Sequence, residues 1–179
     1  RIRPHEIGAL LAYGITEVEV ITVKIGLIPT GSELVPAGER PGPGQAVESN
    51  TGMAAAWLEG LGCRCTRSPL TPDDPDPIRF RLEEAVLAND AVIISAGSSA
   101  GTRDFAAGVI ADLGEVLVHG VAMKPGKPVI LGRIRGKPVI GLPGYPLSAV
   151  TVLRELVEPF LARYGLPSVQ ETEVRATLA

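Results

Sequence analysis

Runs of consecutive apolar residues alternate along this chain with segments in which apolar residues recur every three or four positions. Short apolar runs rich in β-branched residues, bounded by Pro, Gly or polar residues, predict buried strands. Apolar residues at helical spacing, with Pro or a capping residue at the first turn, predict helices. Strands are expected over residues 18–31, 63–67, 91–97, 115–121 and 128–142, the last being two strands joined by an Arg-Gly turn. Helices are expected over residues 4–13, 48–62, 78–90, 104–113 and 146–165.

Two segments show neither pattern. Residues 29–44 contain four prolines and four glycines, and residues 68–77 form a proline-broken acidic stretch, so both are expected to be loops. Ser49 or Asn50 is expected to cap the N-terminus of the second helix, and Gly62 is expected to end it.

The predicted strands are continuously apolar and alternate with helices, which is typical of a mostly parallel sheet covered on both faces. The predicted fold class is therefore α/β, a three-layer α/β/α arrangement. A length of 179 residues suits one compact domain, and a chain with 45% hydrophobic but only 4% aromatic residues must have an aliphatic core. The chain starts at Arg1 and its last stretch looks like a strand just beginning, so we expect a piece of a longer protein.

Charge and cysteine content narrow the classes of function. The formal net charge of −3 argues against non-specific nucleic-acid binding, which needs a basic excess. No apolar run approaches the roughly 18 residues of a membrane span. Cys63 and Cys65 are too close for a good disulfide and have no second pair for zinc, so they are expected to be reduced packing residues of a cytoplasmic protein. His119 lies inside a predicted strand, and the chain offers no Ser-His-Asp set.

Charged and small polar residues follow the predicted strands. Because the carboxyl ends of parallel strands meet at one edge of a sheet, these loops are expected to converge on a ligand. The backbone N–H groups of "AGSSAG" and the helix that follows suit an anion, and the two lysines of "KPGKP" suit phosphate or another oxyanion. Carboxylates beside such an anion favour a bound Mg²⁺. The candidates in these loops are Glu33, Asp73, Asp74, Asp104, Lys124, Lys127 and Ser148.

Each of these motifs also has a purely structural interpretation. A lone Gly/Ser-rich loop is more often a turn, "TPDDPD" suits a solvated helix start, and "KPGKP" suits a type II turn with exposed lysines. Their joint occurrence after successive strands favours the binding site.

The run "HGVAMKPGKPVILGRIRGKPVIGLPGYPLSA" closely resembles the family of molybdopterin molybdenumtransferases, the MoeA type, to which the E domain of gephyrin is related. The stretch "GEVLVHGVAMKPGKP" is its most specific part, and "PTGSELV", "ESN", "TPDDP" and "AGSSAGTRDF" follow the order of the family. The resemblance covers about residues 1–166, with 1–13 as a helix leading in. It implies the third domain of that family, whose α/β fold is shared with molybdopterin adenylyltransferases. Residues 167–179 resemble the start of the small C-terminal β domain.

The resemblance also implies an activity and a set of site residues. Members of the family insert molybdate into adenylylated molybdopterin with Mg²⁺ or Zn²⁺ and release AMP, working as homodimers whose sites are completed by other domains. An isolated fragment is therefore expected to be inactive. The metal ligands implied are Glu33, Asp73 and Asp104, and the catalytic carboxylates are Asp104 with Asp73 or Asp74. The substrate-binding residues implied are Gly97, Ser98, Ser99, Gly101, Lys124, Lys127, Pro143, Gly144, Pro146 and Ser148.

Departures from the family motifs cluster at the same loops. The chain has Ala96 and Ser98 in the glycine-rich loop, and Ser32, Glu48 and Tyr145 where the family usually has Asp, Asp and Asn. This pattern resembles a divergent branch of the family and leaves molybdate and tungstate both open as the inserted oxyanion.

Two other functions stay open at this point. One is adenylyl transfer to molybdopterin, suggested by the "TRD" after the glycine-rich loop but opposed by the "HGVAMKPGKP" run. The other is a non-catalytic, gephyrin-like scaffold in which Tyr145 narrows the pocket.

Overall fold

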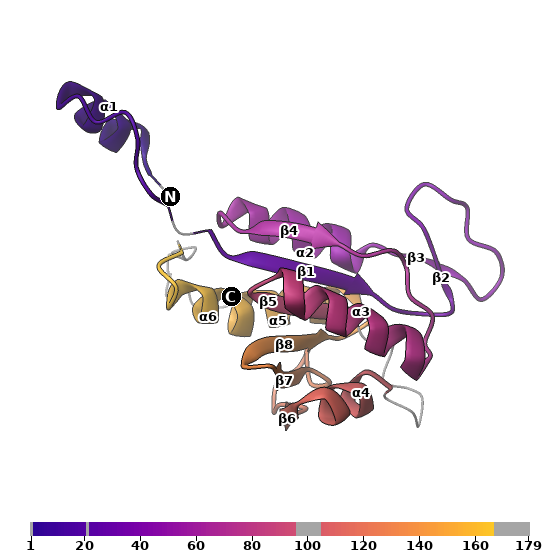
Figure 1. Ribbon diagram of the computed structural model, residues 1–179. Coiled ribbons are helices and arrows are strands. Elements are labelled where there is room, and N and C mark those ends of the chain that lie inside the picture. Colours follow the sequence, from indigo (N-terminus) through magenta and orange to yellow (C-terminus); the bar gives the residue numbers. More distant parts are fainter. Residues whose placement is uncertain (1, 21, 96–104, 167–179) are drawn as a thin grey trace, which may run out of the picture.

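The computed structural model describes residues 2–20, 22–95 and 105–166. Within these ranges a six-stranded sheet has the order β4-β1-β5-β8-β7-β6 (Figure 1). Strands β4, β1, β5 and β8 are parallel, whereas β7 runs antiparallel to both β8 and β6. The expected α/β fold with a mostly parallel sheet is confirmed. The sheet strands are β1 (Lys24–Pro29), β4 (Arg64–Arg67), β5 (Ala91–Ser95), β6 (Glu115–His119), β7 (Ile130–Ile134) and β8 (Lys137–Leu142).

Helices cover both faces of this sheet. One face carries α2 (Asn50–Gly60), α5 (Pro146–Val152), the π-helical turn η1 (Leu153–Val157) and α6 (Glu158–Ala162). The other face carries α3 (Pro75–Ala88) and α4 (Phe105–Leu113). Two short strands, β2 (Leu34–Val35) and β3 (Ala46–Val47), form a separate parallel pair within the long loop after β1.

The core is split between the two faces by the period of two along each strand. In β5, Ile93 packs with the α2 and α5 side, whereas Val92 and Ile94 pack with α3 and α4. The buried residues of both layers are overwhelmingly Val, Ile, Leu and Ala, as the composition indicates. Every residue of β5 is buried, which agrees with its central place between β1 and β8.

Several predicted boundaries are wrong. The strand expected over 18–31 is confined to Lys24–Pro29, because the register with both neighbouring strands begins at residues 24 and 25. Val18 and Val20 precede that register and are 46% and 63% exposed. The helix expected from residue 78 begins at Pro75, because Asp74 caps it and proline is tolerated in the first turn.

The long C-terminal helix also differs from the expectation. It ends at Ala162 rather than 165 and contains the π-helical turn over Leu153–Val157. Pro159 follows that turn, and its missing N–H removes a bond from the regular helical ladder.

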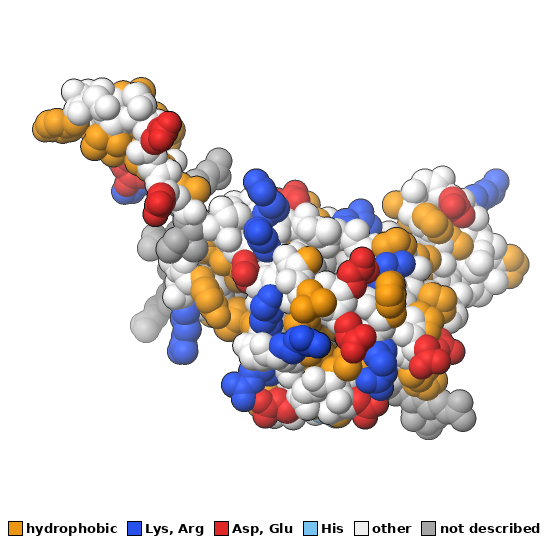
Figure 2. All heavy atoms as spheres, viewed as in Figure 1, with side chains coloured by type: hydrophobic (Ala, Val, Ile, Leu, Met, Phe, Trp, Pro, Cys, Tyr) orange, Lys and Arg blue, Asp and Glu red, His pale blue; other side chains and the backbone are white. Residues whose placement is uncertain are grey.

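Helix α1 (Pro4–Ala12) has no buried residue and lies apart from the sheet (Figure 1). Its apolar side chains include Ile7 and Leu11, and orange spheres mark the apolar surface of this segment in Figure 2. On the face of the main body seen in that figure, acidic and basic side chains are interspersed. Within the described ranges, no helix combines the length and the apolar character needed to cross a bilayer.

The two cysteines are free, as expected, and lie at the start of β4 and just before it. Burial raises the pKa of the Cys63 thiol to about 11. Burial, with smaller effects of Cys63 and Glu59, raises the pKa of Cys65 to about 12. Both thiols are therefore protonated and unreactive near neutral pH.

Candidate functional site

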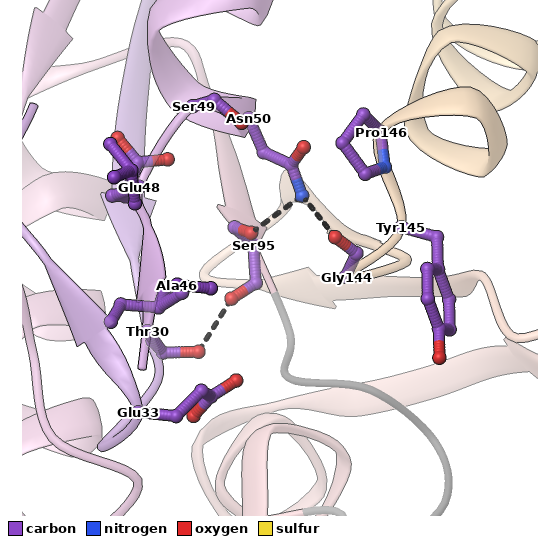
Figure 3. Close-up of a pocket in the computed structure, with 12 residues that line it drawn as sticks. Thr30, Glu33, Ala46, Glu48, Ser49, Asn50, Ser95, Gly144, Tyr145 and Pro146 are labelled. Atoms are coloured by element: carbon purple, nitrogen blue, oxygen red, sulfur yellow. Dashed lines mark hydrogen bonds between the residues drawn. The ribbon is translucent and has the colours of Figure 1, made fainter. Parts of the chain in front are cut away.

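A pocket opens at the carboxyl ends of β1, β5 and β8 (Figure 3). Its volume is about 280 Å³. The end of β1, the β2 and β3 pair, the start of α2, the end of β5 and the loop after β8 all contribute to its wall. The lining residues are Thr30, Glu33, Leu34, Ala46, Val47, Glu48, Ser49, Asn50, Ser95, Gly144, Tyr145 and Pro146. This is the sheet edge at which ligands bind in open α/β folds.

Hydrogen bonds join the strands and loops that form this wall. The Thr30 hydroxyl donates to the carbonyl oxygen of Ser95 at 2.5 Å, linking β1 to β5. Asn50 Nδ2 donates to the carbonyl oxygen of Gly144 at 2.8 Å and lies 3.4 Å from that of Pro143. Asn50 Nδ2 is also 3.5 Å from Ser95 Oγ (Figure 3). The start of α2 is thereby fixed against the loop after β8.

Glu48 organises the N-terminus of α2. Its side chain is 4% exposed, and its carboxylate accepts hydrogen bonds from the Thr51 backbone N–H and the Thr51 hydroxyl, both at 2.8 Å. Arg67 Nη2 donates to the same carboxylate at 2.8 Å, and Arg67 Nε donates to Thr51 Oγ1 at 3.1 Å. Ser49 occupies the N-cap position but its side chain makes no capping bond, so the expected Ser49 or Asn50 cap is corrected to Glu48.

The structure brings together some of the predicted site residues. Glu33, Gly144 and Pro146 line the pocket, and Pro143 is buried directly beside it. The "PTGSE" and "TPDD" segments lie side by side, because Gly31 N donates to Thr71 O and Asp73 N donates to Ser32 Oγ at 3.1 Å.

The two neighbouring aspartates have different surroundings. The side chain of Asp74 accepts from the backbone N–H of Asp76 at 3.1 Å and so caps α3. Asp73 is half-buried, its backbone N–H donates to Ser32 Oγ, and neither aspartate lines the pocket. Asp74 therefore has a structural role at the start of α3.

The "KPGKP" segment lies outside the cavity. Lys124 and Lys127 are exposed and do not line it. Gly126 has a φ of 108°, and a β carbon added there would meet the side chains of Met123 and Val152. The loop therefore packs against α5. Ser148 is half-buried in the first turn of α5. Strand β6 is antiparallel to β7 and therefore parallel to β8. The "KPGKP" segment follows the carboxyl end of β6, so it lies at the same sheet edge as the pocket.

Five predicted site residues lie outside the described residues: Gly97, Ser98, Ser99, Gly101 and Asp104.

Sequence patterns did not single out Thr30 and Ser95, and suggested Asn50 only as a helix cap. Thr30 and Ser95 are 1% and 3% exposed, and these buried polar residues lie just after β1 and at the last position of β5. A small polar residue closing an otherwise apolar strand is the signal that could have identified them.

Comparisons with known proteins identify the family. Residues 26–163 match the family model described as "Probable molybdopterin binding domain". A molybdopterin molybdenumtransferase from Haemophilus influenzae is 34% identical over 164 residues, which is 91% of this chain but 41% of that protein. A putative molybdopterin biosynthesis protein from Methanocaldococcus jannaschii is 30% identical over 89% of this chain and 42% of its own length.

A solved structure of a molybdopterin biosynthesis protein is also similar to this chain. The molybdopterin biosynthesis MoeA protein from Pyrococcus horikosii is 41% identical, with a TM-score of 0.80 over 89% of this chain and 40% of that chain. The chain therefore spans about two fifths of the length of these three relatives.

Proposed function

Because the chain belongs to the family of probable molybdopterin binding domains, we propose that it binds molybdopterin in the pocket at the carboxyl ends of β1, β5 and β8. The observation that carries the proposal is the convergence of separate motifs on one cavity. "PTGSELV" supplies Glu33, "ESN" supplies Asn50 and "LPGYP" supplies Gly144 and Pro146.

The parent protein is proposed to be a molybdenumtransferase. It would insert molybdate, or tungstate, into adenylylated molybdopterin and release AMP, and it would act in the cytoplasm as a homodimer. Relatives named molybdopterin molybdenumtransferase support this assignment over the part of their length that the chain spans. The resemblance of "HGVAMKPGKP" to that family, rather than to the adenylyltransferases, supports it further.

Roles for the individual side chains follow from their chemistry. The exposed ammonium groups of Lys124 and Lys127 suit binding of an oxyanion at the sheet edge, next to α5. Backbone N–H groups of the glycine-rich loop, with Gly97, Ser98, Ser99 and Gly101, are proposed to bind phosphate. Asp104 with Asp73 or Asp74 is proposed to supply the catalytic carboxylates.

The divalent cation of the family needs a set of ligands. Glu33 and Glu48 are the carboxylates that line the pocket, and Glu48 is already engaged by Thr51 and Arg67. Within the described ranges, no three His, Cys, Asp or Glu side chains are grouped as a metal site requires. Glu33, Asp73 and Asp104 stay as proposed ligands.

Removal of a lysine tests the proposal. In the full-length protein, Lys124→Ala is expected to lower molybdate-dependent AMP release by at least about tenfold, the loss expected from one charged contact of about 1.4 kcal/mol. Lys24→Ala is the matched control, because Lys24 is an exposed lysine at the amino end of β1, on the opposite edge of the sheet.

Three outcomes would contradict the assignment. Equal activity of the Lys124→Ala and Lys24→Ala proteins would refute the oxyanion role. Steady consumption of Mg-ATP in the presence of molybdopterin would identify the sister adenylyl transfer instead. Failure of the wild-type protein to bind molybdopterin in isothermal titration would refute the binding function itself.

A further inference from the structure

One buried polar atom beside the pocket lacks a hydrogen-bond partner among the described residues. It is Oδ1 of Asn50, a side chain that is 5% exposed and lines the cavity. Buried amide oxygens are nearly always hydrogen-bonded in folded proteins. An unpaired one at a pocket therefore points to a partner that a ligand supplies.

The orientation of the Asn50 amide is set by its neighbours. Nδ2 faces the carbonyl oxygens of Gly144 at 2.8 Å and Pro143 at 3.4 Å. A carbonyl oxygen can only accept, so the NH₂ group must face these two atoms. Oδ1 is thereby turned the other way, toward the gap between the start of α2 and Pro146 (Figure 3).

The surrounding wall carries carboxylates. Those of Glu33 and Glu48 line the same cavity, and Glu48 already accepts hydrogen bonds from Thr51 and Arg67, as the carbonyl oxygen of Gly144 does from Asn50 Nδ2. Such a wall disfavours a phosphate group and favours the edge of a ring that carries N–H donors. A pterin has such an edge, because it carries an exocyclic amino group beside a ring N–H.

We propose that Asn50 both positions the loop after β8 and recognises the pterin. Its Nδ2 holds the Pro143–Gly144 turn, and its Oδ1 accepts a hydrogen bond from the exocyclic amino group. This inference rests on the proposed binding of molybdopterin. Oδ1 exposes less than 1 Å². The ligand therefore reaches it by displacing the rim at Pro146 and Tyr145, both of which are exposed, Tyr145 to 70%.

The test compares two buried asparagines. Asn89 is also 5% exposed, but its Nδ2 donates to Ala85 O at the opposite edge of the sheet. Asn50→Ala is expected to weaken molybdopterin binding by this chain at least about tenfold, whereas Asn89→Ala leaves the affinity within about twofold. Circular dichroism first establishes a temperature at which both variants are folded. Asn50→Ser serves as a second variant, with the same loss expected, because its hydroxyl is too short to reach Gly144.

A competition assay isolates the recognition step. The wild-type chain is expected to prefer pterin over 4-oxopteridine, which is the same ring without the exocyclic amino group, and Asn50→Ala is expected to lose that preference. If wild-type chain binds molybdopterin but Asn50→Ala binds it as Asn89→Ala does, or keeps the preference, the role of Asn50 is refuted while the proposed function stands. If wild-type chain binds no molybdopterin, both are refuted.

Discussion

The cluster of Glu48, Thr51 and Arg67 shows how single side chains build the start of α2. A carboxylate at a helix N-terminus is stabilised by the free N–H groups there. Glu48 uses this position, and Arg67 adds a charge that is itself 47% exposed, while the carboxylate is 4% exposed. The pair is therefore asymmetric, and loss of the arginine leaves a buried charge with only neutral partners.

Replacement of Arg67 tests that asymmetry. Arg67→Met is expected to lower the free energy of unfolding by about 1–3 kcal/mol, because the buried Glu48 carboxylate loses its charged donor. Urea unfolding measures the change, with Arg64→Met, an exposed arginine on the same strand, as the control. The double variant Glu48→Gln, Arg67→Met should recover part of the loss. A stability for Arg67→Met equal to that of the control would show that the ion pair contributes nothing.

At the scale of elements, the connection between α4 and β6 depends on a close approach of the Gly114 backbone to the backbone of β7. A β carbon added at Gly114 would overlap the carbonyl oxygen of Arg133 on β7. Gly108 lies within α4 with open space where a side chain would be. One glycine is thus required by packing, and the other only weakens its helix.

Alanine at these two glycines should have opposite effects. Gly114→Ala is expected to destabilise the chain by about 2–3 kcal/mol or more, because the backbone of β7 has to move. Gly108→Ala is expected to stabilise it by roughly 0.5–1 kcal/mol, the helix-propensity difference between Gly and Ala. Thermal unfolding of both variants provides the measurement. Equal shifts in Tm would mean that the α4–β6 connection can relax freely.

Pairing between elements explains which parts of the fold could be predicted from the sequence. Strand β5 is apolar from Ala91 to Ile94 and buried at every position, and its start at Ala91 was predicted correctly. The run 18–31 is equally β-branched, yet it is a strand only where neighbours pair with it, and pairing is a tertiary property. Glu33 was predicted because its motif follows a strand, whereas Gly144 and Pro146 were implied by the resemblance to the family, and all three line the pocket. The bridge from Asn50 to Gly144 joins residues 94 positions apart, so no local pattern reveals it.

The whole molecule divides into a packed sheet with its helices and an N-terminal segment that shares none of its core. Both buried clusters start at or after Val23, and α1 contributes no buried residue. Because α1 buries no residue against the core, neither part stabilises the other. An isolated helix of nine residues is also marginal in water.

Deletion of this segment tests the division. Removal of residues 1–20 is expected to shift Tm by less than about 2 °C, since burial of apolar surface is the main source of stability and none is lost. Removal of residues 1–27 takes away Ile25 and Leu27, at 1% and 0% exposure, from the centre of the sheet. That deletion should abolish cooperative unfolding. Far-UV circular dichroism melts distinguish the two, and a large fall in Tm on the shorter deletion would show that α1 packs against the sheet in solution.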